Sequence, residues 1–262
     1  MKDYLQALRP LDSLVFALAF IASVALSMKV KTPRYDFLSP SLLPAILSVT
    51  LLYGGGNVIS SYFEQSTGSE KNQHTYLLWS GLTLGAALIL SLFGSLRFFS
   101  ASLLFGVLLV IYGKYSRMLG IYRSLCAALA GSMVFLLGPL YTGAAGLNWL
   151  LIPLAFLFIT ARETVKDIED IEGHREAGTE TIPIRFGVKT AFAVADICGA
   201  SGLVLSAIYQ AMNVFPPLFL TFLSFAILLY AIGNIFVFAS EAHTFRRYIE
   251  MVILFLLFGT LA

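Results

Sequence analysis

Residues 151–174 read LIPLAFLFITARETVKDIEDIEGH, which is an apolar run followed directly by a dense block of charge. The apolar run extends back to about residue 146 and has the length and character of a membrane-spanning helix. Charged side chains are costly at the end of such a helix, so we interpret the block from Arg162 to His174 as a candidate functional site. The stretch thus predicts both the class of fold and the place of its chemistry.

The composition of the whole chain is that of a membrane protein. Hydrophobic residues make up 58% of the 262 positions, charged residues make up 12%, and the mean hydropathy is +0.83. A water-soluble domain of this length does not normally have these values. The formal net charge of +2 is too small to indicate a nucleic-acid partner. Cys126 and Cys198 lie in apolar segments, where we interpret them as small buried residues rather than as a disulfide or a metal pair.

Nine apolar stretches are long enough to cross about 30 Å of hydrocarbon, which takes roughly 20 residues each. They lie near residues 12–29, 39–61, 74–94, 97–113, 121–141, 146–166, 188–210, 215–239 and 246–262. We therefore predict an all-α fold, a polytopic membrane bundle of nine transmembrane helices that forms a single domain over residues 1–262.

Lysine and arginine are distributed unequally between the two ends of these predicted helices. If the helices alternate in direction, 13 of the 17 basic residues fall on one side of the membrane. Only Lys29, Lys31, Arg34 and Arg97 fall on the other side. Cytoplasmic connections of membrane proteins carry the excess of Lys and Arg. We therefore predict a multi-pass protein of the cell membrane, with its N-terminus in the cytoplasm and its C-terminus outside.

The charged block places an unusual set of side chains on one face of its helix. The residues on that face are Glu163, Lys166, Asp167, Asp170 and His174, because their spacing follows the helical repeat. Mg²⁺ is usually bound by one or two carboxylates together with water and phosphate oxygens. Two carboxylates one turn apart with a cation beside them therefore indicate a site that holds Mg²⁺ against a phosphate.

A purely structural interpretation of the same block stays open. In that interpretation Lys166 pairs with Asp170, four residues later, and the block is a salt-bridged helix end that anchors a loop at the membrane surface. Glu169 and Glu172 fall outside the charged face, and we expect them to be solvated or paired with Arg175.

Two further polar clusters lie on the predicted cytoplasmic side. One begins at a glycine-rich helix end, residues 54–56, and its polar side chains are Asn57, Ser60, Ser61 and Glu64. The other is the connection from Lys114 to Arg123, whose three cations suit polyanionic oxygens. Together with the charged block, they indicate a diphosphate-binding site at a central cavity open to the cytoplasmic side, with an apolar body for a lipid tail.

With these clusters the chain resembles the UbiA-type intramembrane prenyltransferases, and among them the archaeal geranylgeranylglyceryl phosphate geranylgeranyltransferases. The most specific part runs from Arg162 to Pro183, where the spacing of Asp167, Asp170 and the following Gly, Thr and Pro residues resembles the family's second aspartate motif. The family has a third aspartate at the place of His174. The resemblance covers nearly the whole chain and implies the same nine-helix fold.

The family's first aspartate motif is recognisable by the residues around it, but most of its acids are missing. The motif positions read Ser60, Ser61, Glu64 and Gly68, so that only one carboxylate remains. The connection after the fourth helix resembles the family's pyrophosphate-binding loop, with Arg117 where a Lys is usual and Ser124 where an Asn is common.

The resemblance implies roles for particular side chains. Diphosphate binding is expected from Lys114, Arg117, Arg162 and Lys166. Metal binding is expected from Glu64, Asp167 and Asp170, and catalysis from Asp167, Asp170 and Lys166. Further polar candidates are Asn57, Ser60 and Ser61. Since few of the family's acids remain, we expect one Mg²⁺ on Asp167 and Asp170, assisted by Arg117 and Lys166, in place of two.

The resemblance also implies an enzyme, a Mg²⁺-dependent prenyltransferase of membrane lipid biosynthesis. Its expected donor is a prenyl diphosphate such as geranylgeranyl diphosphate, and its expected acceptor is a lipophilic molecule such as geranylgeranylglyceryl phosphate. The sequence makes no prediction about the oligomeric state.

Two other classes of function stay open. The missing acids of the first motif favour a paralogue that binds a prenyl lipid or a partner protein without turnover. A transporter would be indicated by charge in the middle of a span, and only Asp196 and Glu250 approach that position.

His174 has two interpretations of its own. At the place of the family's third aspartate it would be a neutral metal ligand, but imidazole is a poor match for Mg²⁺. We favour the simpler interpretation, a polar loop residue that tolerates replacement.

Overall fold

The computed structural model describes residues 8–31, 39–64, 70–144, 146–238 and 241–261. Within these ranges all regular structure is helical, and no strand occurs, which confirms the predicted all-α class. Seven stretches are apolar enough and long enough to cross a membrane by length and composition. They are Pro10–Met28, Leu42–Phe63, His74–Ser91, Leu96–Tyr115, Gly120–Thr142, Leu147–Glu169 and Val188–Ala211.

The last two predicted spans also correspond to helices, α12 (Phe219–Phe238) and α13 (Ala242–Leu261). The described apolar part of α12, Phe219–Ile235, is shorter than the seven stretches above. The first half of α13 carries the charges of Arg246, Arg247 and Glu250. These two helices therefore differ in length or charge from the other predicted spans.

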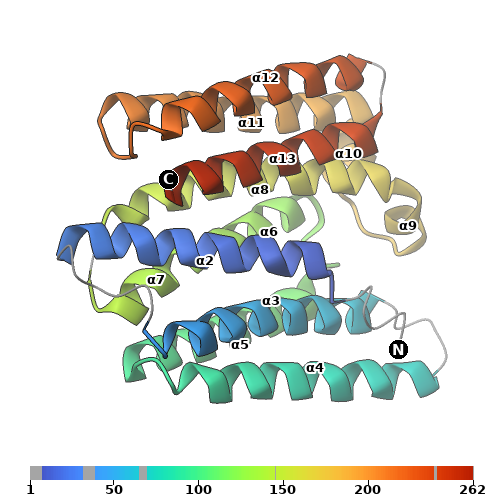
Figure 1. Ribbon diagram of the computed structural model, residues 1–262. Coiled ribbons are helices and arrows are strands. Elements are labelled where there is room, and N and C mark those ends of the chain that lie inside the picture. Colours follow the sequence, from blue (N-terminus) through green and yellow to red (C-terminus); the bar gives the residue numbers. More distant parts are fainter. Residues whose placement is uncertain (1–7, 32–38, 65–69, 145, 239–240, 262) are drawn as a thin grey trace. The chain divides into compact units, whose positions relative to one another are not determined.

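The chain divides into two compact units, each built from two separate lengths of sequence. The first unit comprises the described residues of Met1–Ser116 and Met133–Trp149. The second comprises those of Arg117–Ser132 and Leu150–Ala262. The first unit holds the blue and blue-green helices and α7 in Figure 1, and the second holds α6 and all helices from α8 onward.

The first unit is built around α3 (Leu42–Glu64). Its other helices are α2 (Pro10–Lys31), α4 (Glu70–Ser91), α5 (Leu96–Tyr115) and α7 (Val134–Thr142). Helix α3 packs against α2, α4 and α5, and α7 packs against α2 and α5.

The glycine-rich stretch 54–56 lies inside α3, as it does in the predicted span 39–61. A Cβ on Gly55 would lie 2.9 Å from the side chain of Leu84 in α4, and a Cβ on Gly56 would lie 3.0 Å from that of Leu109 in α5. The glycines therefore allow α3 to approach both neighbours closely, as small residues do between membrane helices.

Helix α7 is joined to α2 by a buried hydrogen bond that follows from a proline, and Asn148, after α7, contacts the same serine of α2. Pro139 lies inside α7 and deprives the carbonyl of Phe135 of its usual donor within the helix. The hydroxyl of Ser23 in α2 donates to that carbonyl at 2.7 Å, and the side-chain amide of Asn148 donates to the backbone carbonyl of Ser23. A side chain at Gly138 would overlap Ser23, so glycine permits this approach.

The predicted span 121–141 is divided into two helices in the structure. Helix α6 (Arg123–Ser132) belongs to the second unit and α7 to the first, with Met133 between them. Two short 3₁₀ helices, η1 (Gly120–Tyr122) and η2 (Leu147–Leu150), precede α6 and α8.

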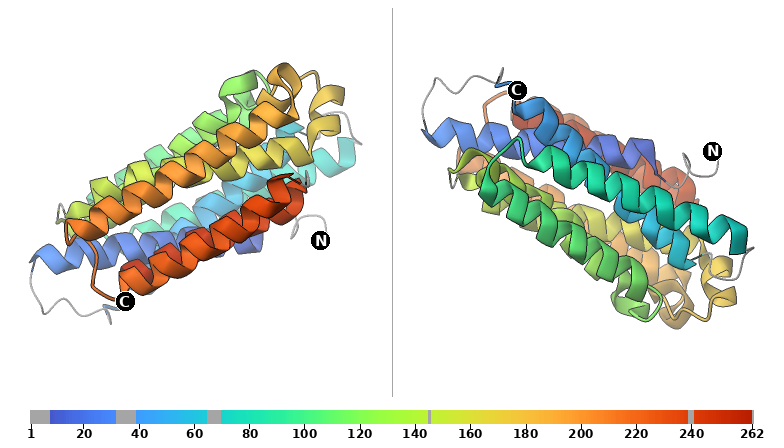
Figure 2. Two further views of the ribbon diagram at one scale, coloured as in Figure 1. Left: turned by 90° about the horizontal axis from the view of Figure 1, so that it is seen from above. Right: turned by 90° about the horizontal axis from the view of Figure 1, so that it is seen from below.

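Helix α8 (Leu151–Glu169) is the central element of the second unit. The other α-helices of this unit are α6, α9 (Ile171–Glu176), α10 (Ile182–Phe186), α11 (Val188–Ala211), α12 and α13. Helix α8 packs against α6, α11 and α13, and against the short helices α9 and α10 that follow it. Figure 2 shows the long helices α8, α11, α12 and α13 running side by side. The charged block therefore lies on the helix with the most neighbours.

Candidate functional site

The candidate site lies at the C-terminal end of α8, where the buried face of the helix continues into the charged block. Ala161 and Val165 are fully buried, and Asp167, in the last turn, is only 4% exposed. A carboxylate is costly to bury unless hydrogen bonds or opposite charges compensate it. The partners of Asp167 therefore identify the site.

The chain turns at Asp170, between α8 and α9. Asp170 has φ −103° and ψ 28°, which is not helical, and its amide still donates to the carbonyl of Lys166 at 3.1 Å. Helix α9 then begins, and it carries His174 back towards the end of α8. Because of this turn, Asp170 and His174, the last two residues of the predicted charged face, do not continue the straight helix α8.

Asp167 is held by two side chains from other elements. Ser124, in the first turn of α6, donates to Asp167 Oδ2 at 2.7 Å, and this hydrogen bond is buried. His174 Nε2, from α9, lies 3.2 Å from Asp167 Oδ1. Each carboxylate oxygen of Asp167 thus has a partner from the chain itself.

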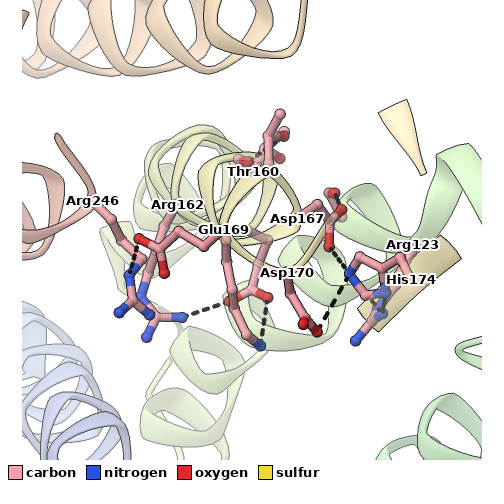
Figure 3. A network of polar contacts seen from close by, with 12 residues as sticks. Arg123, Thr160, Arg162, Asp167, Glu169, Asp170, His174 and Arg246 are labelled. Atoms are coloured by element: carbon pink, nitrogen blue, oxygen red, sulfur yellow. Dashed lines mark hydrogen bonds and ion pairs between the residues drawn. The ribbon is translucent and has the colours of Figure 1, made fainter. Parts of the chain in front are cut away.

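Asp170 reaches the same histidine from the turn. Its Oδ2 lies 4.0 Å from His174 Nε2, and its side chain is 65% exposed. A Cβ on Gly173 would lie 2.5 Å from Asp170 Oδ1, so glycine at this position leaves room for the carboxylate. Figure 3 shows dashed lines from Asp167 and Asp170 that meet at His174. The two carboxylates therefore converge, as the spacing of the motif predicted.

Arg123 completes this group from the side of α6. One Nη atom of its guanidinium lies 3.1 Å from His174 Nδ1 and 3.3 Å from His174 Nε2. Arg123 is 9% exposed, Ser124 1% and His174 5%. The prediction that His174 is a tolerant loop residue is wrong, because it lies in α9 and is buried between an arginine and an aspartate.

A second group of charges surrounds the other side of α8, and it includes Arg162. Arg162 pairs with Glu163 beside it and, at 3.0 Å, with Glu250 of α13. Arg246 of α13 lies 3.1 Å from Glu169 and 3.9 Å from Glu250. Figure 3 shows Arg162 and Arg246 on the opposite side of α8 from His174. These ion pairs link α8 to α13.

The ion pairs of the charged block differ from the pair that the purely structural interpretation of the sequence predicted. Lys166 lies 3.4 Å from Glu163, while the ion pair of Asp170 is with His174, so the predicted pair of Lys166 with Asp170 is wrong. Glu172 pairs with Arg175 at 2.9 Å, as predicted, and both side chains are exposed.

The first-motif residues lie in the first unit, in the second half of α3. Ser61 donates to the backbone carbonyl of Asn57, one turn earlier, at 3.0 Å. The side-chain nitrogen of Asn57 is buried without a hydrogen-bond partner. Ser60 packs against Gly113 of α5, where a Cβ would lie 2.9 Å from the serine hydroxyl. Glu64 is the last residue of α3, and its side chain lies outside the described part of the structure.

The predicted cations of the connection after α5 fall in different units. Lys114 is exposed in the last turn of α5, with its Nζ 5.4 Å from the centre of the Tyr115 ring. Arg117 is half-buried and belongs to the second unit, together with Arg123 and Ser124. The connection thus leads directly from Arg117 to the two residues that contact the end of α8.

The acids and cations at the end of α8 lie in the part of the chain that matches a known family. Residues 13–258 of the chain match the UbiA prenyltransferase family. The chain belongs to this family. The digeranylgeranylglyceryl phosphate synthase of Methanosarcina mazei is 32% identical to this UbiA chain over 239 residues, which cover 82% of the chain and 81% of the relative. The synthase of the same name from Methanosphaera stadtmanae is 29% identical over 231 residues, covering 84% and 82%.

Solved structures of other UbiA proteins have the same fold. A UbiA homologue from Aeropyrum pernix K1 matches with a TM-score of 0.74 at 16% identity, over 94% of this chain and 96% of that one. A UbiA homologue from Archaeoglobus fulgidus bound to GPP and Mg²⁺ matches with a TM-score of 0.69 at 19% identity, over 98% and 97%.

The side chains at the end of α8 fit a magnesium ion that takes some ligands from the protein and the others from a substrate and water. Asp167 and Asp170 supply carboxylate oxygens, and each oxygen of Asp167 keeps a lone pair beyond its contact with Ser124 or His174. Within the described ranges, no three His, Cys, Asp or Glu side chains form a group that could hold a metal. Mg²⁺ readily takes its remaining ligands from water and phosphate.

Sequence reasoning singled out Asp167 and Asp170 but not the side chains that contact them. Arg123 was counted only as a loop cation, Ser124 as a replacement for Asn, and His174 as a loop residue. The signal in the sequence was weak: two adjacent polar residues, Arg123 and Ser124, open the otherwise small and apolar α6. Their importance appears only when α6 is packed against α8.

Proposed function

We propose that this chain transfers an isoprenyl group from a prenyl diphosphate to a lipophilic acceptor in membrane lipid biosynthesis. The expected donor is geranylgeranyl diphosphate, and the expected acceptor is geranylgeranylglyceryl phosphate. Family membership supports the reaction type, and the names of the two archaeal relatives support the acceptor.

The convergence of Asp167 and Asp170 at His174 carries the proposal. An unneeded buried carboxylate would be costly at this place. In the proposed reaction these two aspartates would hold Mg²⁺, which when bound neutralises charge on the diphosphate leaving group. Glu64 of the first unit is the third expected ligand.

The cations of the chain bind and orient the diphosphate in this proposal. Arg117 and Lys166 are expected at its oxygens, with Lys114 and Arg162 as further candidates. The ion pairs of Lys166 and Arg162 with Glu163 orient their side chains before substrate arrives. The bond between C1 of the allylic chain and the diphosphate oxygen breaks, and its electron pair leaves with the diphosphate. The acceptor hydroxyl oxygen bonds to C1, and its proton passes to water.

The membrane arrangement we propose has nine spans, with α12 and α13 added to the seven stretches described above. The N-terminus and the diphosphate site, at a central cavity, face the cytoplasm, and the C-terminus lies outside. The family match extends over residues of both units, which supports their action as one domain. The donor tail would lie among the apolar helices.

A direct assay tests the proposal. Purified protein is incubated with geranylgeranyl diphosphate, Mg²⁺ and geranylgeranylglyceryl phosphate, and diphosphate release and prenylated product are measured. We expect Asp167→Asn with Asp170→Asn to lower the rate by at least about 100-fold, because charge stabilisation of the leaving group is lost. The matched control is Glu172→Gln, which removes an exposed carboxylate of the same segment and should leave the rate unchanged.

The outcomes separate the proposed enzyme from its alternatives. Wild-type protein that binds prenyl diphosphate but releases no diphosphate, with any donor length or acceptor, would favour the binding paralogue. Full activity in the double variant would show that the aspartates do not hold the metal.

A further inference from the structure

Four buried side chains at the end of α8 form a continuous series of contacts, which we call the His174 relay: Arg123, His174, Asp167 and Ser124. None of the four is more than 9% exposed. The relay joins three helices of one unit, because Arg123 and Ser124 open α6, Asp167 ends α8, and His174 lies in α9.

The imidazole of His174 lies between Asp167 and Arg123. Nε2 faces the carboxylate of Asp167 at 3.2 Å, and a carboxylate only accepts, so Nε2 carries a hydrogen. The Nη atom of Arg123 lies 3.1 Å from Nδ1 and 3.3 Å from Nε2, so the guanidinium packs against the imidazole and contacts both of its nitrogens. The contact that acts on the carboxylate is therefore the hydrogen bond from His174 Nε2 to Asp167 Oδ1.

The relay fixes the carboxylate of Asp167 from both sides. Oδ1 accepts from His174 and Oδ2 accepts from Ser124, which prevents rotation of the carboxylate about its bond to the rest of the side chain. Residues that hydrogen-bond a metal ligand set its orientation, and their replacement typically costs about 10–100-fold in metal affinity. Asp170 has no comparable support, because its side chain is largely exposed.

We propose that His174 is a positioning residue that orients Asp167 for Mg²⁺, with Arg123 packed against the imidazole. The inference rests on the proposed function and deepens it. His174 stands where the family resemblance has a third aspartate, so this chain holds the ligand by a hydrogen-bond donor instead of adding a further acid. The expected consequence is a site whose magnesium affinity depends on a residue that touches neither metal nor substrate.

Two variants test the role, and one serves as a control. His174→Ala removes both hydrogen bonds, whereas His174→Gln keeps one donor and one acceptor on a neutral side chain of similar reach. Thr160→Ala, in the same helix as Asp167, removes a buried hydroxyl that bonds only to the backbone of its own helix. Thermal unfolding of each purified variant without metal establishes that it is folded.

The kinetic readout is the Mg²⁺ concentration that gives half-maximal diphosphate release. We expect His174→Ala to raise it about tenfold or more, while kcat and the KM for the donor at saturating Mg²⁺ stay within about threefold. His174→Gln should recover most of the wild-type value, and Thr160→Ala should match the wild type. A merely structural role would instead lower kcat at every Mg²⁺ concentration, and that result would overturn the proposal.

Two further readouts do not depend on turnover. Calorimetry with Mg²⁺ and a non-hydrolysable prenyl diphosphate analogue should show the same order of affinities, with His174→Ala weakest. In the free protein labelled with ¹⁵N-histidine, the resonances that disappear in His174→Ala should report hydrogen on Nε2. If the analogue and Mg²⁺ bind but no diphosphate is released, the proposed function fails while the relay stands. Equal Mg²⁺ affinity in His174→Ala and wild type, or the absence of hydrogen on Nε2, contradicts the relay itself.

Discussion

Gly173 shows how a single residue shapes the charged end of α8. No side chain fits at this position without displacing the carboxylate of Asp170, whose Oδ1 would lie 2.5 Å from a Cβ there. Because Asp170 is largely exposed, its side chain has room to move away at little cost to stability. The glycine therefore matters for where the carboxylate points more than for folding.

We expect Gly173→Ala to lower prenyl transfer about tenfold or more, since the displaced Asp170 no longer converges with Asp167. The unfolding temperature should change little, because alanine favours a helix more than glycine does. The rate and the unfolding temperature are measured on the same preparation. Gly178→Ala is not a matched control, because Gly178 has a positive φ of 67°. An unchanged rate in Gly173→Ala would contradict this role.

Sequence reasoning singled out Asp167 and Asp170 because a charged side chain at the end of an apolar run is energetically costly near lipid. Such a residue is therefore expected to have a function. The contact of Asp167 with Ser124 could not be predicted in this way, because the two residues are far apart in the chain and meet only through the packing of α6 on α8. His174 was interpreted as a replaceable loop residue because imidazole is a poor match for Mg²⁺, and its partners in space could not be seen from the sequence.

At the scale of helices, ion pairs join α8 to α13 in the second unit. Arg162 is 9% exposed and shares Glu250 with Arg246. A buried guanidinium destabilises a protein unless its donors have acceptors. Glu250 therefore stabilises the protein mainly because, without it, Arg162 would lose one acceptor while it stays buried. The charge at position 250, which the sequence placed near mid-span, thus has a structural partner.

We expect Glu250→Ala to lower the free energy of unfolding by about 1–3 kcal/mol, because Arg162 then loses a buried charged acceptor. The measurement is unfolding of the purified protein in mixed detergent. The control is Glu172→Ala, which breaks an exposed pair with Arg175 and should change stability by less than about 0.5 kcal/mol. An equal effect of both substitutions would contradict this explanation.

The sequence predicted the positions of the helices more accurately than their interruptions. Apolar runs predicted α2, α5 and α11 to within a few residues, because span length depends on local composition. The division of span 121–141 at Met133 was missed, although Pro139 lies in it. A proline in a membrane helix is tolerated when another group satisfies the freed carbonyl, and only the structure shows that Ser23 does so.

At the scale of the whole molecule, the distribution of basic residues predicts the orientation in the membrane. We expect a C-terminal alkaline phosphatase fusion to be active and a C-terminal green fluorescent protein fusion to be dark in bacterial cells, because the predicted C-terminus is outside. The same reporters placed after residue 116 serve as the opposite control, since that connection should be cytoplasmic. A cytoplasmic C-terminus would contradict the nine-span arrangement.

The three passages of the chain between the two units, at residues 116–117, 132–133 and 149–150, have a consequence for synthesis. Because α7 completes the first unit through Ser23 and Asn148, that unit lacks a part until residue 149 has left the ribosome. Helix α6 emerges before α8, against which it packs, so Ser124 lacks its partner Asp167 until α8 has been made. A chain that ends at residue 150 should therefore be a target for membrane quality control, even though its first unit is complete.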